Sequence, residues 1–323
     1  MRLIPLLSII CFALVAFGIV RWTQGKRRGR KKEGDARNRL EFKDLPGMTS
    51  PQERNFVREY AARDVRGEGA IVDLGCWLGS FTLPLAICLR ENSRISAHKA
   101  CIHAYDLFVW QDYMNGSVAA TRWAGRYKEG ANFRDAFVEQ IAPVADLVTV
   151  HAGNLNNEVW EPAKPIEYLL IDVMKSWEPV NSVLGNFFPA LRPGLSLVHY
   201  QDFVHYFTPW IHLIMYRFRR YFETLTYIPH GSYVFKYREL IPRELLEKCY
   251  DFGDFSTEEA AAAFEYSLSL IPEAARTNVF AVRIMLQIHR GDKTSARSEL
   301  ERLRTAGVPL EKELAVVSKL LEN

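Results

Sequence analysis

The chain of 323 residues has few cysteines and almost no surplus of charge. Its five cysteines are an odd number, and none stands in a Cys-x-x-Cys or Cys/His spacing, which argues against a disulfide framework and a zinc site. The formal net charge is only +3, and the basic residues behind it gather between Arg21 and Lys32. The remainder is near neutral to acidic, so nothing indicates nucleic acid as a partner.

Two common nucleotide-binding patterns are also missing from the most informative turn of the chain. The segment Asp73-Leu74-Gly75-Cys76-Trp77-Leu78-Gly79-Ser80 fits neither the Gly-x-Gly-x-x-Gly of dinucleotide sites nor a P-loop. It joins a short apolar strand to an apolar helix. Gly75 allows a sharp turn and Gly79 a close approach, because neither carries a Cβ atom. Such a turn binds anionic or nucleotide-like ligands, and the alternative is a βα turn without a ligand.

The first part of the chain favours a membrane anchor. Residues 3–20 carry no charge, and a run of about 18 apolar residues is long enough to cross a bilayer. In a cleaved signal peptide the basic residues precede the apolar run, whereas here they follow it. We expect a membrane anchor over residues 1–20 and a basic linker over 21–45. The positive-inside rule then predicts a single-pass protein whose catalytic domain faces the cytoplasm.

Strands and helices alternate from residue 46 to residue 240. This alternation predicts an α/β fold with a doubly wound, mostly parallel, seven-stranded sheet that ends in an antiparallel hairpin. A helix is expected at 183–191, and the polar and aromatic stretch 108–130 is expected to be a lid or a short helical insert. Residues 241–323 predict only helices, an α-helical appendage that either resembles a tetratricopeptide pair or caps the sheet domain.

Four acids stand at the ends of predicted strands: Asp73, Asp106, Asp172 and Asp202. In an open parallel sheet the carboxyl ends of the strands lie at one edge, and ligands bind there. We therefore expect these four side chains at the same edge, as parts of a single site.

Several blocks of the chain carry a more specific resemblance. They are the turn at 73–80, Ala104-Tyr105-Asp106-Leu107-Phe108, residues 167–177, residues 187–194 and Tyr200-Gln201-Asp202-Phe203. Together they resemble the macrocin O-methyltransferase-like family. Members of this family are class I S-adenosylmethionine (SAM) methyltransferases that act on sugar hydroxyls of secondary metabolites and glycans. The resemblance runs from about residue 48 to about residue 237 and leaves out the anchor and the appendage.

The resemblance implies SAM as the cofactor. Gly75 and Gly79 would let the chain pass the methionine part of SAM, and the Ser80 N–H would face its carboxylate. Asp106 would accept hydrogen bonds from the ribose hydroxyls. The implied cofactor-binding residues are Asp73, Gly75, Gly79, Ser80, Asp106 and Asn154, the last in a turn near the adenine.

The resemblance also implies a divalent cation such as magnesium, bound by an acid after strand four and two adjacent acids after strand five. Asp172 and Asp202 match this pattern, but Gln201 stands where the second adjacent acid is expected. Hard cations favour anionic oxygens, whereas glutamine offers a neutral one. Metal binding by Asp172, Gln201 and Asp202 is therefore left open.

A hydroxyl acceptor must lose a proton, so a base is needed. Asp172, His199 and His205 stand near the expected site, and Asp172 and His205 are the predicted catalytic residues. A single histidine more often packs or caps than catalyses. Lys175 is alternatively a structural ion-pair partner that neutralises Asp172.

Together these features predict a membrane-anchored SAM-dependent methyltransferase. Its acceptor would be a hydroxyl of a sugar or a secondary-metabolite-like small molecule, free or carrier-linked, and its appendage offers a surface for a protein partner. One alternative is a non-catalytic scaffold with the methyltransferase fold, which the missing charge at Gln201 favours. Another is an enzyme of this fold with a different nucleotide-like ligand. The retained Asp73, Gly75, Gly79 and Asp106 favour the methyltransferase.

Overall fold

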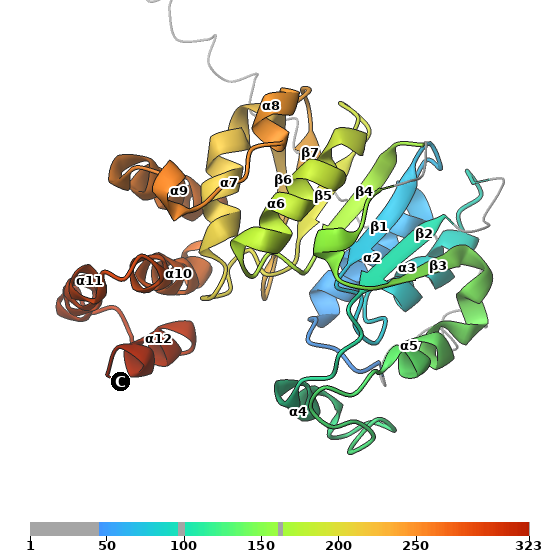
Figure 1. Cartoon of the computed structure of the whole chain (residues 1–323), viewed down its shortest axis with the longest axis horizontal. Helices are drawn as coiled ribbons and strands as arrows, with labels where there is room; N and C mark the ends of the chain where they lie inside the picture. The colour runs from blue at the N-terminus through green and yellow to red at the C-terminus, as the bar shows by residue number, and fades with distance from the viewer. Residues whose placement is uncertain (1–44, 96–100, 161–163, 323) are drawn as a thin grey trace, which may run out of the picture. The chain divides into compact units, whose positions relative to one another are not determined.

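The computed structural model describes residues 45–95, 101–160 and 164–322 (Figure 1). The predicted membrane anchor and residues 21–44 of the predicted linker lie outside this part of the chain. Among the described residues, no helix combines the length and the apolar character needed to cross a bilayer.

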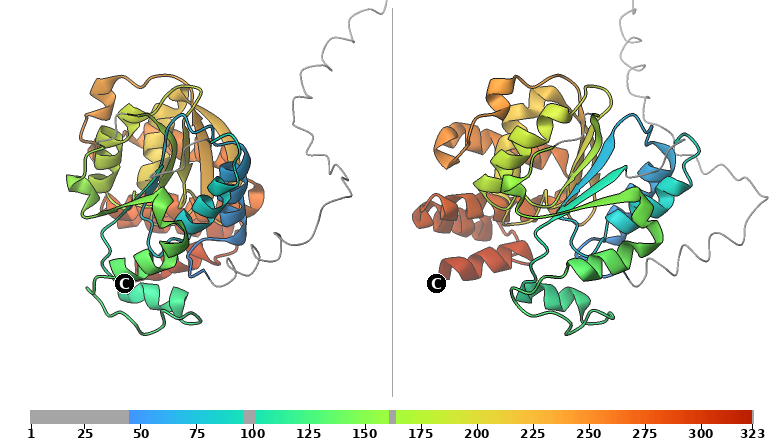
Figure 2. Two further views of the ribbon diagram at one scale, coloured as in Figure 1. Left: turned by 90° about the vertical axis from the view of Figure 1, so that its right-hand side faces the viewer. Right: turned by 45° about the vertical axis from the view of Figure 1, so that its right-hand side comes forward.

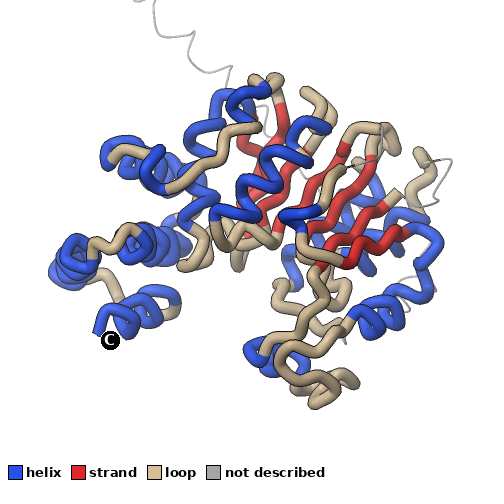
Figure 3. The backbone as a smooth tube through the Cα atoms, in the orientation of Figure 1, coloured by secondary structure: helices blue, strands red, loops and turns tan. Residues whose placement is uncertain are grey.

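A mixed sheet of seven strands forms the centre of the described chain (Figures 1 and 3). Its order is β3-β2-β1-β4-β5-β7-β6. The strands β1 to β5 are parallel, whereas β7 runs antiparallel to both β5 and β6. The predicted seven-stranded sheet with an antiparallel hairpin is confirmed. The strands are β1 (Ala70–Leu74), β2 (Ile102–Asp106), β3 (Val148–Ala152), β4 (Ile166–Ile171), β5 (Leu197–Tyr200), β6 (Phe222–Ile228) and β7 (Ser232–Tyr237).

Helices cover both faces of the sheet, and its central strands are therefore buried throughout. All five residues of β1 and all six of β4 are buried, which is typical of parallel strands between two helical layers. The helices α2 (Pro51–Arg63), α3 (Thr82–Arg90) and α5 (Arg134–Ile141) lie on one face (Figure 2). The helices α6 (Trp177–Asn186) and α7 (Pro209–Phe218) cover the other face and share one apolar core with β1, β4 and β5.

Local capping signals set the helix boundaries. A capping box begins α2, since the Ser50 hydroxyl accepts the Glu53 N–H at 3.1 Å and the Glu53 carboxylate accepts the Ser50 N–H at 2.7 Å. The helix expected at 183–191 is instead α6, which begins at Trp177. Pro179 lies in its first turn, where the missing N–H costs no intrahelical bond, so this proline does not delay the start.

The stretch between β2 and α5 is a helical insert with aromatic packing of its own. It contains a 3-10 turn, η1 (Asp112–Met114), and the short helix α4 (Asn115–Val118). The side chains of Trp110 and Trp123 are buried within it. Because the insert directly follows β2, it leaves the sheet at the edge where ligands are expected (Figure 1).

The helices after the sheet form two packed groups. They are α8 (Arg243–Leu246), α9 (Thr257–Leu270), α10 (Arg276–His289), α11 (Lys293–Thr305) and α12 (Glu313–Glu322). Helix α9 packs on α7 and extends the core of the sheet, with 2.7 Å between His212 Nδ1 and Ser267 Oγ. Helices α10, α11 and α12 enclose a second apolar cluster, against which Tyr206 also packs. The appendage therefore reaches the loop that follows β5.

Candidate active site

The strand ends bring several predicted residues to one edge of the sheet. Leu74 pairs in register with Tyr105 on β2 and with Ile171 on β4, and Ile171 pairs with Tyr200 on β5. Since β1 lies between β2 and β4, the direction of the strand order reverses at this point, and such a reversal leaves a crevice for a ligand. The residues that follow these four positions share the edge: Gly75, Asp106, Asp172 and Gln201.

The turn after β1 requires glycine at two places. Gly75 has a φ of +89° and Gly79 a φ of +80°, conformations that strain any residue with a Cβ atom. At Gly75 an added Cβ would also lie 3.0 Å from the carbonyl oxygen of Asp172, so two backbones approach closely here. At Gly79 the space around an added Cβ is ordinary, and the backbone angle alone demands glycine.

Backbone N–H groups hold the Asp106 carboxylate in place. Its Oδ2 accepts the Trp77 N–H at 2.8 Å, and its Oδ1 accepts the Phe108 N–H at 2.7 Å. Trp77 and Phe108 have positive φ values of 45° and 54°, each costing about 1–3 kcal/mol for such a residue. Burial raises the pKa of Asp106, and the two N–H groups oppose that shift. Strained backbone of this kind is typical of ligand sites, and here it orients one carboxylate.

Asp73 lies inside β1, one residue before its end, and is buried. One carboxylate oxygen accepts the Thr82 hydroxyl at 2.6 Å, which ties the first residue of α3 to the strand beneath the turn. The other oxygen, Oδ1, has no hydrogen-bond partner in the described part of the chain. Burial raises the pKa of Asp73 from 3.8 to about 7. Its contact with a cofactor stays a prediction.

Local hydrogen bonds fix the two remaining predicted cofactor residues. The Ser80 hydroxyl donates to the Pro46 carbonyl oxygen at 2.8 Å. The Gly153 N–H donates to the Asp106 carbonyl oxygen at 3.1 Å, which places Asn154 next to the end of β2. The Asn154 side chain accepts a backbone N–H two residues later at 3.0 Å and caps a 3-10 turn. The roles of Ser80 and Asn154 toward SAM stay predictions.

A cluster of charged and amide groups forms where β4 and β5 end. The Lys175 Nζ atom lies 2.8 Å from Asp172 Oδ1 and 3.2 Å from Asp202 Oδ2. With its amide nitrogen turned toward the acids, Gln201 donates to Asp172 at 2.8 and 3.0 Å and to Asp202 at 3.2 Å. The Asp172 and Asp202 side chains are only 19% and 14% exposed. We call Asp172, Lys175, Gln201 and Asp202 the lysine cluster.

Electrostatics within the lysine cluster favour the protonated form of Lys175, whereas burial disfavours the ionised form of Asp172. Burial raises the pKa of Asp172, an effect that the Lys175 charge opposes and the Asp202 charge reinforces. Burial alone would lower the pKa of Lys175, but the two carboxylates outweigh burial and raise it. Lys175 is therefore protonated at neutral pH, and its charge also acts on Asp106, on the other half of the edge.

The lysine cluster does not fit the predicted divalent cation. Such an ion needs several oxygen ligands, but here an ammonium group already contacts both carboxylates and the Gln201 amide donates to them. Among the residues that the structure describes, no group of three or more His, Cys, Asp or Glu side chains is placed to hold a metal ion. A metal ion therefore enters no step of the function proposed below.

The two candidate histidines pack against other partners. His199 is buried inside β5, its Nδ1 pairs with the Tyr168 hydroxyl, and burial lowers its pKa to about 3. It is therefore neutral and enclosed, which does not suit a base. His205 follows β5, with its Nε2 3.7 Å from Glu313 Oε1 of α12 and its ring against Phe207. Its catalytic role stays a prediction.

Two aromatic residues, Phe207 and Tyr113, also belong to the candidate site. The Lys175 Nζ atom lies 5.6 Å from the centroid of the Phe207 ring. Tyr113, on the insert, is 62% exposed; partial burial raises its pKa, and the charges of Lys175 and Asp172 act on it. The insert is thus within electrostatic reach of the lysine cluster. No sequence pattern connected Tyr113 with β4.

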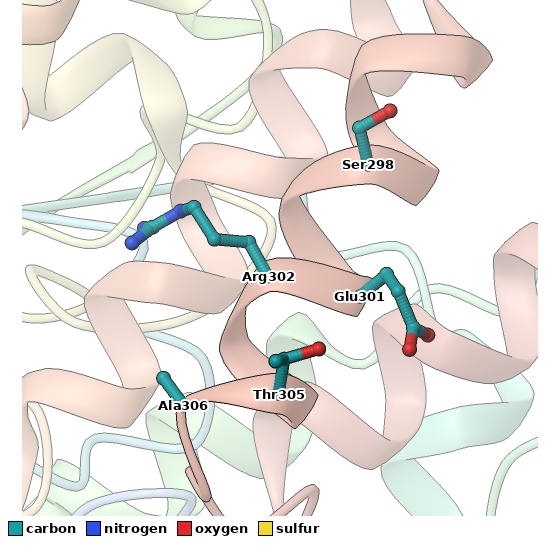
Figure 4. Close-up of a pocket in the computed structure, with 5 residues that line it drawn as sticks. All are labelled: Ser298, Glu301, Arg302, Thr305 and Ala306. Carbon is teal, nitrogen blue, oxygen red and sulfur yellow. The ribbon is translucent and has the colours of Figure 1, made fainter.

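A shallow hollow on the appendage does not belong to this site. Figure 4 shows its five lining residues along α11 and its C-terminal end. They are Ser298, Glu301, Arg302, Thr305 and Ala306. Arg302 is already paired with Glu299, with a hydrogen bond of 2.8 Å from its Nε atom. Because a single helix and its end form this hollow, and no predicted site residue lines it, we place the ligand site at the sheet edge.

The seven-stranded mixed sheet, with helices on both faces, is a doubly wound α/β fold. No family model and no curated protein matches the chain. Among solved structures, the O-methyltransferase NovP shares 17% identity, and the match covers 60% of this chain and 83% of NovP with a TM-score of 0.46. The calicheamicin methyltransferase CalS11 shares 14% identity over 65% of this chain and 95% of its own, with a TM-score of 0.42. The O-methyltransferase TomG from Streptomyces achromogenes shares 14% identity over 65% and 92%, with a TM-score of 0.38.

Proposed function

We propose that this protein is a SAM-dependent methyltransferase that transfers a methyl group to a hydroxyl oxygen. The observation that carries the proposal is the oriented Asp106 carboxylate beside the Gly75 turn, at the point where the strand order reverses. Each oxygen of that carboxylate keeps a lone pair for a further donor, which suits the two hydroxyls of a ribose. A βα turn without a ligand would not need two strained residues to orient an acid.

The residues at the ends of β1 and β2 fit this cofactor. Bound there, SAM would supply an electrophilic methyl group on a sulfonium sulfur, which keeps the bonding electrons when the methyl group leaves. Asp106 would hold the ribose, the Gly75 turn would let the methionine part pass the backbone, and Asn154 would lie near the adenine. The main task of the protein is then alignment, because a well-oriented pair of reactants reacts far faster than a free one.

We propose that Asp172 is the base that removes the proton from the acceptor hydroxyl. Its backbone closely approaches the Gly75 turn, so its position joins the cofactor half of the edge to the lysine cluster. The carboxylate would take the proton as the oxygen bonds to the methyl carbon. His205 is the second candidate base, because it stands in the loop after β5 and is held there by Glu313.

The acceptor that we propose is a hydroxyl of a sugar or of a secondary-metabolite-like compound. Three aromatic residues support this choice: Tyr113 on the insert, and Tyr206 and Phe207 in the loop after β5. Aromatic faces pack against sugar rings and other flat or apolar groups, and the hydroxyls of the two tyrosines can bind polar substituents. A carrier-linked sugar fits the same description.

Isothermal titration of the full chain with S-adenosylhomocysteine tests the proposal. We expect saturable binding between about 1 μM and 1 mM, the range typical of enzyme substrates. ATP and NAD are the controls, because they would bind if the same fold served another nucleotide-like ligand. Absence of binding by SAM and S-adenosylhomocysteine at about 1 mM would remove the methyltransferase hypothesis.

We also propose that the enzyme acts at the cytoplasmic face of a membrane. The support is the uncharged run at 3–20 and the basic residues that follow it. An acceptor already held at the membrane would then meet the enzyme at a raised effective concentration. Protease treatment of sealed vesicles tests the orientation, with detergent-opened vesicles as the control. A domain that is protected inside the lumen until detergent is added would contradict this location.

A further inference from the structure

The lysine cluster carries an inference beyond the transfer of a methyl group. Asp172 and Asp202 follow two neighbouring strands, so the sheet itself brings their carboxylates together. Two ionised carboxylates that lie side by side repel each other unless a cation lies between them. In this chain that cation is a side chain, since the Lys175 Nζ atom lies 2.8 Å from Asp172 Oδ1 and 3.2 Å from Asp202 Oδ2.

We propose that Lys175 is a built-in replacement for a divalent cation and makes the acceptor side of the site independent of metal ions. A magnesium ion held by these carboxylates would lie about 2.1 Å from each ligand oxygen. Because the Lys175 ammonium group already contacts one oxygen of each acid, ion and ammonium group cannot occupy this place together. The role toward an acceptor rests on the proposed function, but the exclusion of metal can be measured without it.

Gln201 supports this assignment through its charge. Three carboxylates around a divalent cation would have a net charge of minus one, and Asp172, Asp202 and Lys175 have the same net charge when all three are ionised. An acid at position 201 would add a further negative charge that Lys175 alone does not balance. Glutamine avoids that charge, and its amide nitrogen donates to both acids from a position that is only 6% exposed.

The surroundings of Lys175 leave its charge partly exposed at the strand-end edge. Its side chain is 41% exposed, and its Nζ atom lies 5.6 Å from the centroid of the Phe207 ring, in the loop after β5. The charge also acts on Asp106, on the cofactor half of the edge. A fixed ammonium group between the loop after β5 and the end of β2 would stabilise an acceptor oxygen as that oxygen loses its proton.

Manganese binding by the full chain, followed by electron paramagnetic resonance, tests the proposal with Mn²⁺ as the probe. The wild type and Lys175→Arg should leave Mn²⁺ free up to about 1 mM, because both keep a cation between the acids. The double variant Lys175→Met/Gln201→Asp should bind Mn²⁺ at least about 100-fold more tightly, because three carboxylates are then open. Lys248→Met is the matched control, since it also takes a lysine from an ion pair, and it should behave as the wild type.

Two results would overturn the proposal. One is Mn²⁺ binding by the wild type that Asp172→Asn abolishes, and the other is a folded double variant that binds no more Mn²⁺ than the wild type. Should the double variant not fold, Lys175→Met alone decides, because it opens the same two carboxylates and should bind at least about tenfold more tightly. Titration of the wild type with S-adenosylhomocysteine separates the hypotheses. Its failure would remove the proposed function, while the Mn²⁺ result still decides whether Lys175 fills the cation position.

Discussion

The two halves of the strand-end edge orient their acids by different means. At the ends of β1 and β2, backbone N–H groups of two left-handed residues hold Asp106. At the ends of β4 and β5, the side chains of Lys175 and Gln201 hold Asp172 and Asp202. The first half therefore depends on backbone angles, and the second depends on charge. Substitutions and pH should separate the two.

The largest effect is expected in the backbone half. Gly75→Ala places a Cβ atom at a φ of +89° and 3.0 Å from the Asp172 carbonyl oxygen. Strain and overlap together should lower the free energy of unfolding by about 3 kcal/mol and abolish S-adenosylhomocysteine binding. Denaturant unfolding and isothermal titration measure both effects. The control is Gly116→Ala in α4, where no atom lies within 4 Å of an added Cβ; equal behaviour of the two variants would contradict the prediction.

A smaller loss is expected when the acid itself is removed from the same half. Asp106→Ala should weaken S-adenosylhomocysteine binding by about 1–3 kcal/mol, the usual cost of losing hydrogen bonds to a charged group. It also leaves the Trp77 and Phe108 N–H groups without their acceptor. Asp112→Ala removes an exposed acid of the nearby insert and serves as the control. Unchanged affinity in Asp106→Ala would mean that the ribose does not bind at β2.

The free energy of unfolding should depend on pH because of Asp73, the buried acid of the backbone half. The folded-state pKa of Asp73 is about 7 and its ordinary value is 3.8, so the folded protein holds an extra proton between these values. The free energy of unfolding should therefore fall as the pH rises through this window, by at most about 1.4 kcal/mol per pH unit. The Asp73→Asn side chain cannot ionise and keeps an acceptor for the Thr82 hydroxyl. The free energy of unfolding of this variant should therefore lack the fall with pH that Asp73 causes.

Unfolding experiments at a series of pH values check this prediction. The wild type should lose stability relative to Asp73→Asn between about pH 4 and pH 7. Parallel curves for the two proteins would show that the Asp73 carboxyl is ionised in the folded state as readily as in the unfolded chain.

The smallest effect is expected at the rim of the side-chain half. Glu313→Gln removes the charge opposite His205 but keeps an acceptor for the Tyr206 N–H. Because this pair is partly exposed and spans 3.7 Å, the free energy of unfolding should change by less than about 0.5 kcal/mol. Glu313→Ala also loses the acceptor and should cost about 1 kcal/mol. Urea unfolding compares the variants, and equal costs would show that charge, not the hydrogen bond, holds the loop.

The backbone half was easier to predict from the sequence than the side-chain half. The order of residues from Asp73 to Ser80 indicates a turn, because glycine stands at both positions where φ is strongly positive. No pattern predicts that Trp77 and Phe108 also adopt left-handed angles, since bulky residues do so only when their surroundings impose it. The start of α6 was likewise misplaced: the helix begins at Trp177, and Pro179 in its first turn costs no intrahelical hydrogen bond.

By itself, the sequence determined the alternation of strands and helices, the glycine turn and the presence of acids at the strand ends. These features depend on neighbours along the chain, through local hydrogen bonds, backbone angles and apolar periodicity. Only the tertiary structure decided that Lys175 contacts Asp202 as well as Asp172, and that Gln201 faces both acids. The reason is that the partners of a charge depend on which strands lie side by side, and β4 meets β5 only once the whole sheet has formed.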